Sequence, residues 1–228
     1  IAKNAIDLIK KSDPPLLIEK SRLNHIRPGN LTDDFDQIKD ADWIIEAVVE
    51  RIDIKHQLYS QIDKVRSSNS IVSSNTSTIP LSVLTEEMSE SMKSDFCITH
   101  FFNPVRFMRL LEIVETPQVD VKKLESLRDF CQNELGKGIV NCNDTPGFIG
   151  NRIGVFAMQV AMYEALDRGL PVEIADALFG RPLGIPKTGV FGLYDLIGID
   201  LMKDVLASFK KELNEDDPFM DVVKPHPI

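Results

Sequence analysis

Hydrophobic and polar positions in the first 142 residues follow two alternating periods. Apolar residues at helical spacing predict helices over 1–11, 33–41, 53–65, 80–88 and 121–135. Short apolar runs bounded by turn residues predict strands over 26–30, 42–50, 70–78, 95–101, 110–115 and 138–142. Because strand and helix alternate, the pattern predicts a mostly parallel sheet with helices on its faces.

The alternation stops near residue 143, and only helical spacing follows. Residues 146–169 are expected to form one long helix, which starts at Pro146 and closes at Gly169. Residues 172–180 and 193–213 predict further helices. We therefore expect an α/β domain over 1–143 and an all-α domain over 144–228.

The composition narrows the classes of partner. The net charge of -9 and the pI of about 5.0 argue against nucleic acid or an anionic membrane as the main partner. The longest apolar stretch, "VFAMQVAMYEAL", is interrupted by Gln159 and Glu164, so no membrane span is expected. Cys97, Cys131 and Cys142 are widely spaced, which predicts reduced thiols, a cytoplasmic location and no metal site.

Three predicted strands end in polar or reactive residues. Glu46 and Glu50 close the first, "SSNTS" at 73–77 closes the second, and His100 closes the third. If these strands are parallel, their ends share the edge of the sheet where ligands gather in open α/β folds.

His100 has two interpretations. A lone histidine at a strand end is often only a hydrogen-bonded structural residue. Histidine is also the usual general base near neutral pH. Glu112, isolated in "RLLEIVE", could be placed by the next strand against the imidazole and fix its tautomer. Alternatively, that strand is an edge and Glu112 faces solvent.

The remaining polar motifs also have simpler explanations. "SSNTST" contains residue types typical of turns and helix caps. "DTPGFIGNR" is first of all a helix start, with Asn151 near the first turn, from which it could point into an interdomain cleft. His25, His56 and His226 lie in polar surroundings and are expected at the surface.

Taken together, "SSNTST", "HFFNP" followed by "MRLLE", and "DTPGFIGNR" resemble the L-3-hydroxyacyl-CoA dehydrogenase family of fatty-acid β-oxidation, from about Asp42 to Asp200. The resemblance implies a Rossmann-type NAD domain followed by a helical domain. It implies oxidation of a 3-hydroxyacyl-CoA to the 3-ketoacyl-CoA, with hydride passed to NAD⁺. The competing hypotheses are a non-catalytic relative that serves as a binding module, and another NAD-dependent 3-hydroxyacid dehydrogenase.

The resemblance also implies roles for individual residues. His100 would be the base that takes the 3-hydroxyl proton, with Glu112 as its orienting partner. Ser77 and Asn151 would hydrogen-bond the substrate around its reacting oxygen.

For the cofactor, the resemblance implies a second set of residues. Asn103, with Ser77, would lie near the nicotinamide, and Glu50 and Lys55 would contact the nicotinamide-ribose side.

The chain departs from the family pattern at its beginning. The family starts with a strand, a G-x-G-x-x-G turn and a helix that hold the pyrophosphate. The nearest candidate here, "GKGIVN", has Asn141 at the third glycine and precedes a strand. We therefore expect a fragment without the first βαβ unit. We expect this fragment, on its own, to bind NAD weakly or not at all.

A second departure lies at 185–190, where extra residues precede "FGLYDLIGID". This arrangement is more similar to the dehydrogenase portion of fused bacterial β-oxidation proteins. The family also implies a homodimer formed through the helical domain.

Overall fold

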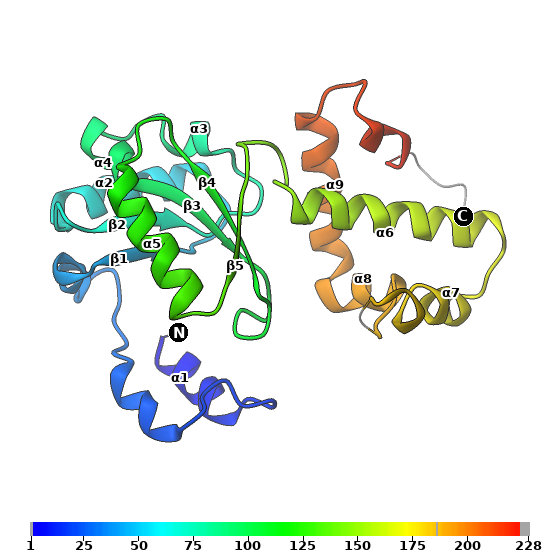
Figure 1. The fold of residues 1–228 in the computed structure, drawn as a ribbon, viewed down its shortest axis with the longest axis horizontal. Coiled ribbons are helices and arrows are strands. Elements are labelled where there is room, and N and C mark those ends of the chain that lie inside the picture. Colours follow the sequence, from blue (N-terminus) through cyan, green and yellow to red (C-terminus); the bar gives the residue numbers. More distant parts are fainter. Residues whose placement is uncertain (1, 186, 224–228) are drawn as a thin grey trace. The chain divides into compact units, whose positions relative to one another are not determined.

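The structure is a computed structural model that describes residues 2–185 and 187–223. It divides into two compact units (Figure 1). The first contains the chain up to Asn75 together with Leu84–Val140, and the second contains Thr76–Val83 and the chain from Asn141 onward. Each unit is described by itself.

The first unit is built on a five-stranded sheet in the order β1-β2-β3-β4-β5. Its strands are β1 (Trp43–Glu46), β2 (Ile71–Ser74), β3 (Phe96–Phe101), β4 (Leu110–Glu115) and β5 (Gly138–Asn141). The first three are parallel, whereas β4 runs antiparallel to β3. The predicted mostly parallel sheet, followed by helices, is therefore confirmed. The ends of β1, β2 and β3 share one edge, as their parallel direction requires.

Two helices cover the two faces of this sheet. On one face, α2 (Ile52–Val65) buries Tyr59, whose ring meets the edge of Phe96 at a centroid distance of 5.2 Å. On the other face, α5 (Val121–Asn133) packs Leu124 and Leu127 against the alternate strand residues, Ile71, Cys97, Leu111 and Ile113. The two-residue period of a strand thus sends neighbouring side chains to different helices.

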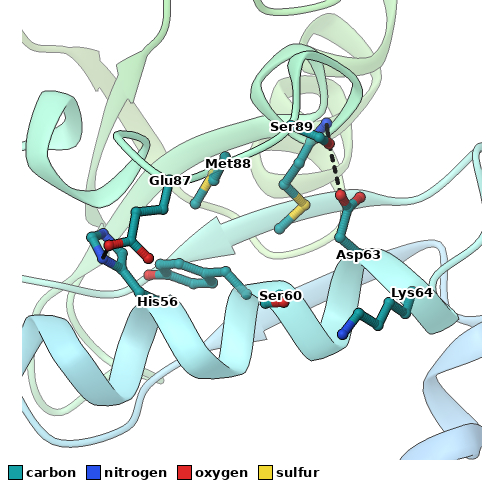
Figure 2. Close-up of a pocket in the computed structure, with 9 residues that line it drawn as sticks. His56, Ser60, Asp63, Lys64, Glu87, Met88 and Ser89 are labelled. Atoms are coloured by element: carbon teal, nitrogen blue, oxygen red, sulfur yellow. Dashed lines mark hydrogen bonds and ion pairs between the residues drawn. The ribbon is translucent and has the colours of Figure 1, made fainter.

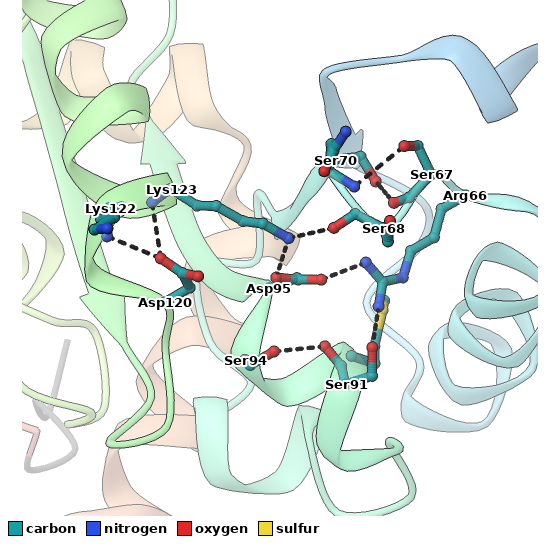
Figure 3. Close-up of polar contacts among 12 residues, drawn as sticks. Arg66, Ser67, Ser68, Ser70, Ser91, Ser94, Asp95, Asp120, Lys122 and Lys123 are labelled. Atoms are coloured by element: carbon teal, nitrogen blue, oxygen red, sulfur yellow. Dashed lines mark hydrogen bonds and ion pairs between the residues drawn. The ribbon is translucent and has the colours of Figure 1, made fainter.

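A buried acid holds the sheet at the end opposite the candidate site. Asp95 accepts a 2.6 Å bond from Arg66 Nη1 and a 2.5 Å bond from Lys123 Nζ (Figure 3). Only 5% of the Asp95 side chain and 3% of that of Arg66 are exposed. This cluster joins the end of α2, the start of β3 and the start of α5 by paired charges, which a buried carboxylate requires.

The prediction of a strand over 26–30 is wrong. These residues are irregular and exposed. Pro28 has no amide to give to a ladder, and Asn30 Oδ1 accepts from the amides of Thr32 and Asp33, each at 2.8 Å, which turns the chain. The region is instead helical in pieces: α1 (Ala2–Lys11), η1 (Lys20–His25) and η2 (Phe35–Asp40).

Two short helices, α3 (Leu81–Leu84) and α4 (Glu90–Ser94), lie between β2 and β3. Strand β1 ends at Glu46, so Glu50, which was predicted to close this strand, lies after it.

The second unit is helical. It contains α6 (Gly150–Asp167), α7 (Val172–Leu178), η3 (Arg181–Leu183), α8 (Phe191–Ile197), α9 (Ile199–Glu212) and η4 (Pro218–Asp221). Its core gathers Val155, Met202, Phe209 and Phe219. Helix α6 begins later than predicted because Gly147 (φ 72°) and Phe148 (φ 47°) are left-handed. No helix in the described ranges is long and apolar enough to cross a membrane.

Candidate active site

His100 and Glu112 form a buried pair in the first unit. They are register partners of the antiparallel strands β3 and β4, and His100 Nδ1 lies 2.7 Å from Glu112 Oε2. The Glu112 side chain is fully buried, and 7% of the His100 side chain is exposed. A carboxylate that accepts from Nδ1–H leaves Nε2 as the basic nitrogen of the ring. The pair therefore has the geometry of a base and its orienting carboxylate, and Glu112 does not face solvent.

The two phenylalanines after His100 lie on different faces. The Phe102 ring stands edge-on to the imidazole at a centroid distance of 4.5 Å. Phe101 packs with the α5 core and lies 6.2 Å from the Trp43 ring. Phe102 therefore covers the imidazole, whereas Phe101, which the strand period turns to the other face, belongs to the core.

The hydroxyls that end β2 mostly hold the sheet together. Ser73 Oγ accepts from Trp43 Nε1 at 2.8 Å and from Thr99 Oγ1 at 2.7 Å. Asn75 Oδ1 accepts from the amide of Phe101 at 3.0 Å, directly after His100. Asn75 thus fixes the end of the strand that carries His100. The sequence placed it only within a polar strand end.

Glu46 is the centre of a buried network at the end of β1. Its carboxylate accepts from Lys55 Nζ at 2.8 and 3.0 Å, from Tyr59 Oη at 2.6 Å, from Ser74 Oγ at 2.7 Å and from the amide of Val48 at 2.6 Å. Burial raises the pKa of Tyr59, and the charge of Glu46 raises it further, so this phenol stays a donor. The sequence placed Glu46 only among the polar strand ends and could not show this network, since its side-chain partners come from other elements.

Glu50 is the exposed end of this network. Its Oε2 lies 3.0 Å from Lys55 Nζ, and 36% of the Glu50 side chain is exposed, against 1% of that of Lys55. Lys55 is therefore buried and paired with two carboxylates, those of Glu46 and Glu50. Of the two residues expected to contact a ribose, the structure leaves Glu50 accessible and places Lys55 as its support.

The other expected site residues are distributed over both units. Asn103 is exposed in the loop after β3, in the first unit. Ser77 is half-buried in the segment 76–83, and Asn151 is half-buried in the first turn of α6, so both belong to the second unit.

Several cavities of the first unit are lined by residues other than His100. One, of about 220 Å³, lies between α2 and the residues before α4 (Figure 2). His56 lines it, 3.4 Å from Glu87, and 12% of the His56 side chain is exposed, so His56 is half-buried and not fully exposed as expected. His25 is exposed as expected, and His226 lies outside the described residues.

A second cavity is a groove of about 720 Å³ beside Trp43 and Phe130, on the α5 face of the sheet. In the part of the chain that the structure describes, no group of three or more His, Cys, Asp or Glu residues could hold a metal ion.

Two family models match the chain. Residues 2–145 match "3-hydroxyacyl-CoA dehydrogenase, NAD binding domain", and residues 147–225 match "3-hydroxyacyl-CoA dehydrogenase, C-terminal domain". The chain belongs to the 3-hydroxyacyl-CoA dehydrogenase family. It carries the NAD-binding domain of this family of oxidoreductases.

Relatives of this 3-hydroxyacyl-CoA dehydrogenase family chain occur in single and in multifunctional proteins. A protein of Rickettsia felis, provisionally named a fatty acid oxidation complex trifunctional enzyme, is 42% identical over the whole chain, which covers 32% of that protein. A protein of Deinococcus radiodurans, provisionally named a 3-hydroxyacyl-CoA dehydrogenase, is 36% identical over 96% of the chain, which covers 63% of it. The chain thus spans less than two thirds of either.

Among solved structures, the 3-hydroxybutyryl-CoA dehydrogenase of Escherichia coli K12 is 29% identical. Its TM-score is 0.75, and the match covers 91% of this chain and 44% of that one.

Proposed function

We propose that the chain supplies the catalytic residues of an L-3-hydroxyacyl-CoA dehydrogenase. The reaction would oxidise the 3-hydroxyl of an acyl-CoA to a ketone and pass hydride to NAD⁺. The observation that carries this proposal is the buried His100–Glu112 pair, with 2.7 Å between Nδ1 and Oε2. It accords with the family of the chain.

His100 would take the proton of the 3-hydroxyl on Nε2. Glu112 would keep Nδ1 protonated and stabilise the imidazolium that forms. The Phe102 ring, 4.5 Å from the imidazole, would shield the pair from water. Ser77 and Asn151 would hydrogen-bond the reacting oxygen, each through a side chain that can both donate and accept.

NAD, when bound, would supply the hydride acceptor. A ribose presents hydroxyl donors, and the accessible Glu50 carboxylate, held by Lys55, is an acceptor suited to them. Lys55 would support that contact, and Asn103 would lie near the nicotinamide ring. The chemistry of these side chains therefore fits the nicotinamide and ribose of NAD.

We also propose a setting for the enzyme. Cys97 and Cys131 share one core cluster and would remain thiols in the cytoplasm. Large apolar side chains are exposed around the turn between α8 and α9, with Leu196 73%, Ile199 66% and Leu201 55% exposed, which favours a homodimer through the helical unit. Given the Rickettsia relative, the dehydrogenase would operate within a fused β-oxidation protein.

For the test, the N-terminal segment of the Deinococcus relative, of which this chain covers 63%, is fused ahead of the chain. With acetoacetyl-CoA and NADH, we expect loss of NADH absorbance. His100→Ala should lower turnover by about 10²–10⁴-fold, which is the contribution of a positioned base. His25→Ala, a histidine exposed in η1, is the matched control and should leave turnover unchanged. A His100→Ala rate equal to that of the parent fusion would rule out this mechanism.

A further inference from the structure

The segment 76–83 belongs to a different unit from the strand that precedes it. Residues up to Asn75 pack with the sheet, whereas Thr76–Val83 pack with the unit that begins at Asn141. Thr76 is buried, and its Oγ1 accepts from the amide of Ile79 at 3.0 Å, which turns the chain out of β2. Ser77 lies inside this turn. Its placement therefore depends on what holds 76–83 to the helical unit.

Asp144 makes that connection with both oxygens. Its Oδ1 accepts from the amide of Leu81 at 2.6 Å, and its Oδ2 accepts from the amide of Ser82 at 2.9 Å. These amides open α3, where a carboxylate is favoured by both hydrogen bonding and the helix dipole. The cap comes from a residue distant in sequence, so it ties two segments together besides ending a helix.

The chain between Asp144 and Asn151 is itself fixed in a tight turn. The amide of Phe148 donates to the carbonyl of Thr145 at 2.9 Å, and the backbone is left-handed at both Gly147 and Phe148. The Phe209 ring fills the space beside the Gly147 Cα, so no Cβ fits there. A turn held in this way transmits the position of Asp144 to the first turn of α6, which carries Asn151.

We propose that Asp144 is a positioning residue, which joins the Ser77 segment to the start of α6 so that Ser77 and Asn151 are presented by one structural piece. The inference rests on the proposed function, in which these two side chains hold the reacting oxygen. Asp144 acts through the backbone of α3 and does not touch the substrate.

The chain offers a matched control. Asp120 is also a capping carboxylate, but a local one: its Oδ1 accepts from the amides of Lys122 at 2.9 Å and Lys123 at 3.1 Å, which open α5. Asp120→Ala and Asp144→Ala each remove a capping carboxylate, but only the second releases the segment of Ser77. A difference between the two variants therefore reports positioning and not the loss of a cap.

The first measurement is amide hydrogen exchange on the 228-residue chain. We expect Asp144→Ala to speed exchange at Leu81 and Ser82 by at least tenfold, and Asp120→Ala to leave these amides unchanged. Unchanged exchange in Asp144→Ala would overturn the proposal. This readout does not depend on dehydrogenase activity. If the parent fusion shows no turnover, the proposed function fails while the exchange result still decides whether the tie exists.

The second measurement is a double-mutant cycle in the active fusion. Ser77→Ala and Asp144→Ala should each lower kcat/KM for acetoacetyl-CoA by tenfold or more, with Asp120→Ala at the parental value. The double variant should be no slower than Ser77→Ala alone, because both substitutions remove the same contact, that between Ser77 and the reacting oxygen. If the two losses multiply, or if Asp120→Ala is as slow as Asp144→Ala, Asp144 only stabilises the fold.

Discussion

Lys55 Nζ lies 2.8 Å from Oε1 of Glu46, and neither side chain has more than 1% of its surface exposed. Removing one charge of a buried pair leaves the other uncompensated. We expect Lys55→Met to lower the free energy of unfolding by about 3–5 kcal/mol, measured by urea denaturation.

The pair of Arg51 and Asp53, at the start of α2, is the control for this change, since more than half of each side chain is exposed. Arg51→Met should leave the urea midpoint unchanged, because solvent screens an exposed pair. An equal loss in both variants would show that Glu46 does not depend on its pairing with Lys55.

Glu112 should matter for catalysis and less for binding. Glu112→Gln keeps the shape of the side chain but removes the charge that stabilises an imidazolium. We expect kcat in the active fusion to fall by about 10²–10⁴-fold, with the KM for acetoacetyl-CoA nearly unchanged. Glu115→Gln is the control on the same strand, since Glu115 pairs with Arg128 and half of its side chain is exposed. A parental kcat in Glu112→Gln would exclude its orienting role.

Two glycines near the start of α6 should respond in opposite ways to alanine. Gly147 has φ 72° and the Phe209 ring against it, whereas Gly154 lies within α6 with open space beside it. Gly147→Ala should cost more than about 1 kcal/mol of stability, because both the backbone and the ring must move. Gly154→Ala should add about 0.5–1 kcal/mol. Thermal denaturation of both variants checks this, and destabilisation by Gly154→Ala would contradict it.

Buried thiols should make stability depend on alkaline pH. Burial raises the pKa of Cys97 to about 12 from an ordinary value of 9.0, with the neighbouring Cys131 thiol as a smaller cause. A raised folded-state pKa means that the stabilisation is complete below pH 9.0 and is lost as the pH rises toward 12, since only the unfolded thiol ionises in that window.

The measurement is the free energy of unfolding between pH 8 and pH 11. In Cys97→Ala the fall across this range should be smaller than in the parent protein. Cys142→Ala, which changes a half-buried thiol, is the control and should follow the parent curve. Identical curves for parent and Cys97→Ala would contradict the prediction.

The proposed homodimer can be tested at the turn between α8 and α9. Leu196 is 73% exposed, and a carboxylate in its place would be buried by any contact there. We expect light scattering to report a dimer for the parent chain and a monomer for Leu196→Glu. Ile18→Glu, at an 88% exposed residue of the first unit, should remain dimeric. A parent chain that is monomeric at micromolar concentration would contradict the dimer.

Local patterns predicted the fold class well, because the alternation of helical and strand periods, and its end near residue 143, can be recognised in short stretches of sequence. The strand expected over 26–30 failed because a strand exists only when a ladder partner lies beside it, and Pro28 and Asn30 favour a turn. The late start of α6 could not be predicted, because nothing in "PGF" requires a phenylalanine with a left-handed backbone.

For the candidate site, a lone histidine and a lone carboxylate in apolar surroundings already indicated a pair. The bonds of Glu46 could not be predicted, because they join two strands and a helix. The cap by Asp144 could not be predicted either, since the amides that donate to it, those of Leu81 and Ser82, lie 63 and 62 residues away in sequence.

The antiparallel register of β3 and β4 has a consequence for how this chain can change. His100 faces Glu112 because the two strands are paired residue for residue, and not because the connection between them has a particular length. Insertions or deletions between Phe102 and Arg109 can therefore remodel that loop while the pair stays in place. A one-residue slip of β4 would instead turn Glu112 toward α5 and leave His100 without its carboxylate.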